Sequence, residues 1–209
     1  MKQNLVRLVP LFMIFLPSLG YAADNNIQVG YNSGNIEYSV SGVSVDLTLE
    51  GLDYGGTIAV GDDYLIGYNF SDLDGNLLGF KFTLKITNIG VGMKLVDDLD
   101  YSRGSGSKLI LGLSSRDSEI SAKVNGVTYA EKEAATLLTG RYEVAAGKGL
   151  SMNLGLSGQT NNFDPTYNVG LSAVSGNSKT SLNYAWNTDK IGAVTVKATN
   201  FALSYALLF

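Results

Sequence analysis

The chain ends on residues 200–209, which read NFALSYALLF. With a period of two, large apolar side chains fall on one face and small or polar side chains fall on the other. The apolar face carries Phe201, Leu203, Tyr205, Leu207 and Phe209, and the opposite face carries Asn200, Ala202, Ser204 and Ala206. Successive side chains of a β-strand point to opposite faces. The stretch therefore predicts a strand that separates an apolar environment from a polar one.

The other end of the chain has the three parts of an export signal. Lys2 and Arg7 give a positive start, residues 8–19 form an apolar run, and Gly20-Tyr21-Ala22 offers small residues to a signal peptidase. The run is too short to span a bilayer as a helix, although an N-terminal anchor is the alternative. We expect cleavage after Ala22, or after Ala23, so that 1–22 is a signal peptide and 23–209 is one domain.

These two ends resemble those of outer-membrane β-barrel proteins of Gram-negative cells, whose last strand alternates in this way and closes on Phe. The resemblance fixes no single family. It implies that the barrel-assembly machinery reads Tyr205, Leu207 and Phe209 as an assembly signal. It also implies export to the outer membrane, where outer-membrane lipid and lipopolysaccharide would surround the folded chain.

Composition narrows the range of functions. The 209 residues include 15 Lys and Arg, 19 Asp and Glu, no His and no Cys. Without a basic excess, nucleic-acid binding is not expected. Without Cys there are no disulfides or thiolate metal sites, and without His there is no Ser-His-Asp triad. We therefore expect no enzymatic activity, no cofactor and no metal.

Alternation continues through the chain in short segments separated by turns. Besides the last strand, the segments are 43–50, 55–61, 64–71, 77–87, 89–97, 107–115, 119–129, 135–146, 149–157, 166–175 and 179–187. Together they predict an all-β, antiparallel, up-and-down transmembrane β-barrel of 12 strands. The alternative is 10 strands, if the weaker segments 55–61 and 119–129 are not independent; 27–34 is ambiguous and stays outside the count.

The connections support the same fold. Short turns are predicted at 62–63, 87–88, 116–118, 147–149 and 176–178, and mostly longer, polar connections at 51–54, 72–76, 98–106, 130–134, 158–165 and 188–193. Membrane barrels have short periplasmic turns and longer outside loops. Both chain ends are then predicted to lie on the short-turn side.

If every apolar face meets lipid, the charged side chains of the strands point inward. The predicted lining comprises Lys81, Lys85, Lys94, Lys108, Lys123 and Arg141 as a cationic wall, with Asp46, Glu50 and Glu143 as acids. A charge on the lipid face would cost about 2–4 kcal/mol near the midplane. Inward placement therefore avoids that cost.

Two functions fit such a lining. The leading hypothesis is a porin-like channel for passive diffusion of small polar or anionic solutes, because charged linings tune selectivity. The alternative is a closed structural or adhesive barrel that acts through its extracellular loops on partners or lipopolysaccharide. Unpaired lysines in an open lumen would favour the channel, whereas an occluded, salt-bridged lumen would favour the closed barrel.

Overall fold

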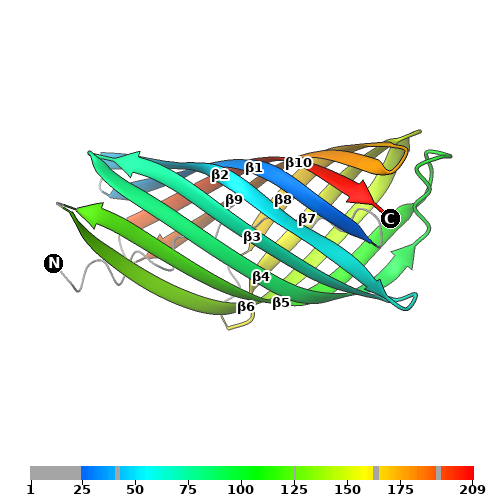
Figure 1. Cartoon of the computed structure of the whole chain (residues 1–209), viewed down its shortest axis with the longest axis horizontal. Coiled ribbons are helices and arrows are strands. Elements are labelled where there is room, and N and C mark those ends of the chain that lie inside the picture. The colour runs from blue at the N-terminus through cyan, green and yellow to red at the C-terminus, as the bar shows by residue number, and fades with distance from the viewer. Residues whose placement is uncertain (1–24, 41–42, 125, 162–164, 192–193) are drawn as a thin grey trace.

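The computed structural model describes residues 25–40, 43–124, 126–161, 165–191 and 194–209, and these form a closed antiparallel barrel of ten strands (Figure 1). The strands are β1 (Asn26–Val40), β2 (Val43–Val60), β3 (Tyr64–Leu77), β4 (Phe80–Asp97), β5 (Ser107–Val124), β6 (Val127–Gly147), β7 (Leu150–Gln159), β8 (Thr166–Ser175), β9 (Ser178–Ile191) and β10 (Val194–Leu208). Each strand pairs with its sequence neighbours, and β1 pairs with β10 to close the wall. The predicted signal peptide, 1–22, lies outside the described residues.

The up-and-down barrel is confirmed with the alternative count of ten strands, and the count of 12 is wrong. Three pairs of predicted segments are single long strands: 43–50 with 55–61 in β2, 77–87 with 89–97 in β4, and 107–115 with most of 119–129 in β5. The ambiguous segment 27–34 belongs to β1. At each predicted break, the apolar side chains change from odd to even positions or the reverse. The backbone continues through these points as regular strand.

The two ends of the barrel differ. β1 begins and β10 ends at the same end of the barrel, here called the near end (Figure 1). The connections 61–63, 98–106, 148–149 and 176–177 also lie there. The opposite, far end holds the turn Leu78-Gly79 between β3 and β4. The segment 98–106 was predicted as a long outside loop but lies at the near end, because β4 is one strand and not two.

An apolar belt surrounds the near half of the barrel on its outer side. On β7 it presents Leu150, Met152, Leu154 and Leu156, which are 40–57% exposed in the isolated chain. Aromatic rings add to it: Trp186 stacks against Tyr167 and Tyr184, with ring centroids 5.7 and 5.8 Å apart. Such a belt is the surface that a membrane barrel turns toward lipid. Among the described residues, no helix is long and apolar enough to cross a membrane.

The far half reverses this polarity along six adjacent strands. Its inward side chains pack into an apolar core of Ile36, Leu47, Leu49, Leu73, Leu84, Ile86, Val196 and Ala198, each at most 2% exposed. Its outward side chains are polar, and they include Glu37, Asp46, Glu50, Asp72, Asp74, Lys81 and Lys85. This is the arrangement of a water-soluble protein, because water favours polar groups outside and apolar groups inside.

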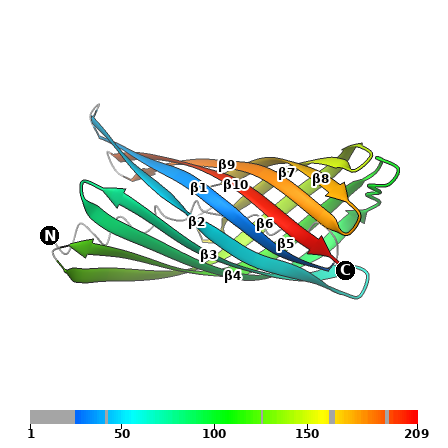
Figure 2. The same cartoon turned by 45° about the horizontal axis from the view of Figure 1, so that its top comes forward.

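We call this part of β10 and β1 to β5, together with the start of β6 that pairs with β5, the extension. In β1 it begins after Tyr31, where outward side chains change to Ser33, Asn35 and Glu37. The roughly eight residues of β1 beyond this point, at the usual rise and tilt of a barrel strand, carry the extension about 20 Å beyond the apolar belt. β7 and β8 have only 10 residues each, so the extension is one-sided (Figure 2). The barrel therefore has a lipid-facing half and a water-facing half.

Candidate functional site

The interior of the near half is lined by amide and hydroxyl side chains. Nine amide side chains are each at most 7% exposed: Asn26, Gln28, Asn32, Asn69, Asn88, Asn153, Asn183, Asn187 and Asn200. Some contact each other across strands, as when Asn200 Nδ2 donates to Asn32 Oδ1 at 3.4 Å and Gln28 Nε2 donates to Asn69 Oδ1 at 3.5 Å. Glycines make the room: a side chain at Gly30 would collide with the carboxylate of Asp53. The polar face predicted for the last strand does line this interior.

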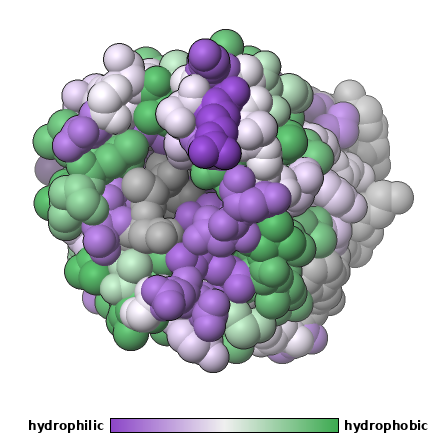
Figure 3. Space-filling view, turned by 90° about the vertical axis from the view of Figure 1, so that its right-hand side faces the viewer, coloured by the Kyte–Doolittle hydropathy of each residue, from purple (hydrophilic) through white to green (hydrophobic). Residues whose placement is uncertain are grey.

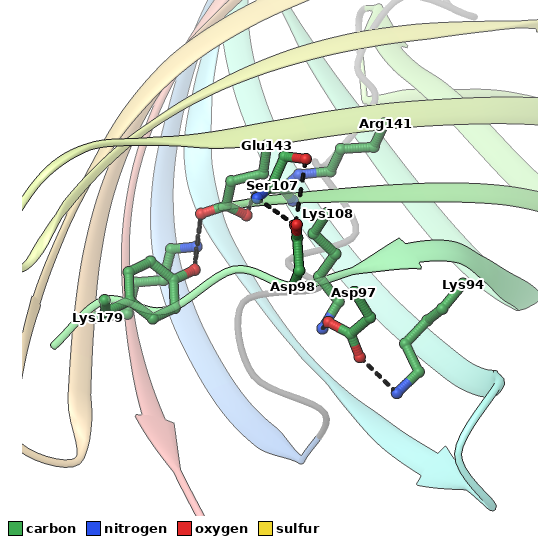
Figure 4. A network of polar contacts seen from close by, with 9 residues as sticks. Lys94, Asp97, Asp98, Ser107, Lys108, Arg141, Glu143 and Lys179 are labelled. Carbon is green, nitrogen blue, oxygen red and sulfur yellow. Dashed lines mark hydrogen bonds and ion pairs between the residues drawn. The ribbon is translucent and has the colours of Figure 1, made fainter. Parts of the chain in front are cut away.

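A charged cluster centred on Glu143 of β6 lies inside the barrel toward the near end (Figure 4). Its carboxylate accepts hydrogen bonds from Lys179 Nζ at 2.6 Å, Tyr101 Oη at 2.7 Å and Ser151 Oγ at 2.5 Å. Arg141 Nη2 lies 3.4 Å from its second oxygen. Glu143 and Lys179 are each 1% exposed. A pair buried this deeply is retained only with good geometry and further hydrogen bonds, and both are present here.

A second ion cluster lies beside the first, where β4 ends (Figure 4). Asp97 contacts Lys94 Nζ at 2.8 Å through one oxygen and Lys108 Nζ at 3.2 Å through the other. The two lysine side chains are 5% and 7% exposed. A register shift between Lys94 and Val96 bends β4 at this point. One carboxylate thus serves two inward lysines.

The segment 98–106 folds across the near end and brings Tyr101 into the first cluster. Its backbone is tied to the wall, since Gly149 N–H donates to Tyr101 C=O at 2.8 Å and Ala145 N–H donates to Gly106 C=O at 3.1 Å. Gly104 and Gly106 have φ of 70° and 85°, which glycine adopts without strain. Viewed onto this end, hydrophilic residues lie across part of the mouth (Figure 3).

Tyr101 links this segment to the buried charges. Lys179 Nζ donates to its hydroxyl at 3.1 Å and also lies 5.4 Å from its ring centroid. Burial, and then the neighbouring carboxylate of Glu143, raises the pKa of Tyr101. The hydroxyl therefore stays protonated and donates its hydrogen to Glu143.

The structure divides the predicted lining into two groups. Lys94, Lys108, Arg141 and Glu143 point into the barrel. Contrary to expectation, the other five point outward into water from the extension: Lys81, Lys85, Lys123, Asp46 and Glu50. Their segments alternate as expected, but the apolar face of the extension is its inner face. No continuous cationic wall forms, and a selectivity role for the inward residues stays a prediction.

Four interior residues were missed by the reasoning from sequence. Lys179 shares a strand face with Ser181 and Asn183, and this pattern could have identified it. Arg116 was predicted to lie in a turn, although it continues the inward positions 112 and 114 of β5. It is 2% exposed, and the negative charge of Glu133 favours its charged form. Asp97 and Tyr101 follow the regular part of β4, where no periodic signal exists.

The outer face of β10 carries the three residues predicted as an assembly signal. Tyr205, Leu207 and Phe209 are 45%, 54% and 70% exposed on the apolar belt. β10 pairs with β1 along its whole length, from Asn26↔Leu208 to Ser39↔Thr195, so it forms the seam of the barrel. Their recognition by an assembly machinery stays a prediction.

Comparison with known proteins identifies the fold. No family model matches the chain, and no curated protein matches it in sequence. Among solved structures, the transport unit of the autotransporter AIDA-I from Escherichia coli matches with a TM-score of 0.53 and 10% identity, covering 100% of this chain and 98% of that one. This chain has the fold of an outer-membrane β-barrel protein.

Two further solved structures share this barrel fold. The outer membrane protease OmpT from Escherichia coli matches with a TM-score of 0.51 and 11% identity, covering 92% of this chain and 99% of that one. The translocator domain of the autotransporter NalP from Neisseria meningitidis matches with a TM-score of 0.50 and 8% identity, covering 100% and 95%. At such identities the likeness shows the fold, and function must be argued from the residues of the barrel itself.

The chemistry of the interior is that of a paired network that keeps an excess of positive charge, because four cations share two carboxylates. Four of the inward cations, Lys94, Lys108, Arg141 and Lys179, each contact a carboxylate, and Arg116 is a fifth inward cation. In the part of the chain that the structure describes, no three His, Cys, Asp or Glu side chains gather as metal ligands. The arrangement is suited to holding the wall and the near-end segment together.

Proposed function

We propose that this chain is a closed barrel of the outer membrane that acts through the water-exposed extension beyond the lipid. One observation carries the proposal: polarity reverses along the strands, so that apolar side chains fill the inner side of the extension and charged ones cover its outer side. The alternative, a porin-like channel, requires a continuous water path.

The interior argues against such a path. An ion passing along the inner side of the extension would meet Leu47, Leu49, Leu73 and Leu84, none more than 2% exposed, and apolar surfaces of this kind disfavour ions. Toward the near end the ion would meet lysines that already contact carboxylates. Paired charges attract a passing solute less than free ones, so we expect weaker anion selectivity than a wall of free cations would give.

The outer wall of the extension supplies a surface for partners. It carries ion pairs between neighbouring strands, such as Lys81–Asp74 at 3.1 Å and Lys132–Glu119 at 3.0 Å. The turn between β3 and β4 has only two residues, so the wall itself presents more surface than that turn. We infer that partners, or the sugars of lipopolysaccharide, contact this wall; the surface was expected on extracellular loops.

Conductance of the refolded barrel in a planar bilayer tests the proposal. We expect a silent bilayer from protein whose folding is verified by heat-modifiable mobility, because apolar side chains pack inside the extension and the inward lysines are paired with carboxylates. Steady anion-selective steps would contradict the closed barrel. They would establish a channel if Lys108→Glu, inside the barrel, reduced anion selectivity while the matched Lys85→Glu, on the outer wall, left it unchanged.

A further inference from the structure

The start of β6 has an unpaired side, here called the free edge. β6 pairs with β5 from Val127 onward, but it pairs with β7 only from Leu137, because β7 and β8 are short and β6 extends past them toward the far end (Figure 1). Among the described residues, no strand pairs with the second side of β6 between Val127 and Ala135. The inward side chains Val127 and Tyr129 are accordingly 52% and 49% exposed. A row of strand backbone groups therefore faces water on this side of the extension.

The backbone groups of the free edge are arranged as in the middle of a sheet. Thr160 N–H donates to Thr136 C=O at 3.0 Å, so the backbone groups of Thr136 point to the β7 side. Every second residue of a strand points its N–H and C=O to the same side. The open side is thus faced by the backbone groups of Thr128, Ala130, Lys132 and Ala134. β6 contains no proline and pairs here with β5 without a register shift, so neither proline nor a bulge shields the free edge.

Two acids lie on the inner side of the free edge. Glu131 and Glu133 both point inward, and their negative charges repel each other. Arg116 of β5 attracts Glu133, whereas Glu131 forms no ion pair in the part of the chain that the structure describes. Lys132 points outward and contacts Glu119 at 3.0 Å, so it does not neutralise them. A cationic side chain placed opposite the two acids would be attracted by both.

From these observations we propose that an extended, cationic polypeptide segment of a partner adds to the free edge of β6 as an antiparallel strand. Only another extended backbone matches a row of alternating donors and acceptors. Its inward positions would meet Glu133 and Glu131 first, and then Tyr129 and Val127, so two cations followed by two apolar residues fit the edge.

A second copy of this chain fits the free edge less well. Pairing two such edges about Lys132 sets the two acids of one copy opposite those of the other, and like charges directly opposite destabilise a sheet. The inference deepens the proposed function and rests on it, because the free edge must lie in water beyond the lipid.

Binding of a synthetic peptide to the full chain in lipid nanodiscs, followed by fluorescence anisotropy, tests the proposal. The peptide alternates Thr with Lys, Lys, Val and Val, in that order from its N-terminus, and a control peptide has the reversed order. We expect the first peptide to bind and the reversed one to bind about tenfold more weakly, because its lysines would lie opposite apolar side chains. Methylating the peptide nitrogens that face β6 should abolish binding, since their N–H groups are the donors to the edge.

Ala134→Pro tests the free edge in the barrel itself. The N–H of Ala134 points to the open side, so proline removes no bond to β5 and is tolerated there. It does remove a donor for the added strand. We expect Ala134→Pro to fold, as checked by heat-modifiable mobility, and to bind the peptide about tenfold more weakly. Ala134→Ser, which keeps the N–H, should bind as the unchanged chain does.

A matched pair of acid variants tests the charge. Glu131→Gln should weaken peptide binding, whereas Glu50→Gln, on the outer wall of β2, should not. Binding that neither Ala134→Pro nor reversal of the peptide weakens would overturn strand addition. Dimers of the barrel that form without peptide and dissociate in Ala134→Pro would also overturn it, in favour of a second copy. Absence of binding in a folded, non-conducting barrel would overturn strand addition and leave the proposed function standing, whereas a conducting barrel would contradict the proposed function.

Discussion

Glu143 is the residue on which the interior depends most. Its carboxylate pairs with both Lys179 and Arg141 and also accepts a hydrogen bond from Tyr101 of the near-end segment. Desolvating these charges costs several kcal/mol per ion, and the pair is favourable only while both partners remain. Removing one partner should therefore lower the free energy of unfolding far more than replacing both partners by apolar residues would.

Glu143→Gln should lower the free energy of unfolding by about 3–5 kcal/mol, because it leaves a buried lysine without its counter-charge. Urea unfolding in lipid vesicles, followed by the fluorescence of the single Trp, measures this. Glu119→Gln is the matched control, since its pair with Lys132 is exposed and should contribute less than about 1 kcal/mol. An equal decrease in the free energy of unfolding in both variants would show that the buried cluster contributes no more to stability than the exposed pair.

β4 shows at the scale of one element how a strand crosses from lipid to water. Its outward positions are Lys81, Thr83, Lys85 and Thr87 in the extension, and then Ile89, Val91 and Met93 in the apolar belt. The backbone keeps one alternation from Lys81 to Met93. Only the environment changes, and with it the kind of side chain that each face requires.

Thiol labelling tests this reading of β4, because the chain has no cysteine of its own. We expect Lys85→Cys to react rapidly with a membrane-impermeant maleimide in the folded barrel. Lys94→Cys should react only after unfolding, since the Lys94 side chain is 5% exposed inside the wall. The opposite order of reactivity would return Lys85 to the interior, where the sequence pattern had placed it.

At the scale of the whole molecule, the same exterior must suit two solvents. The belt around the near half is apolar, and the extension is polar and charged. The position of a substitution along the barrel should therefore matter as much as its chemistry.

A pair of arginine variants tests this division. Leu154→Arg puts a charge on the belt, where it costs about 2–4 kcal/mol near the midplane, and should reduce the folded fraction in vesicles. Thr48→Arg, on the exposed outer wall of β2, should fold as the unchanged chain does. Heat-modifiable mobility measures both. If the two variants assembled equally well, the belt would not be the lipid boundary.

The sequence by itself determined that this chain forms strands, that they alternate, and that the near-half interior is polar. It could do so because, in the belt, one face of each strand meets lipid and the other meets the polar interior. Apolar residues such as Leu154 therefore alternate with polar ones such as Asn153. The same pattern misled in the extension. An apolar set at Leu47 and Leu49 reads identically whether it faces lipid or a core.

Only the tertiary structure decided which face of the extension is the inner one, because that depends on where the lipid ends. It also decided the partners of the buried charges. Lys179 and Glu143 are 36 residues apart in the chain, and Tyr101 reaches them from a segment without periodicity. Such contacts follow from closing the wall into a barrel, which brings together side chains that no local pattern relates.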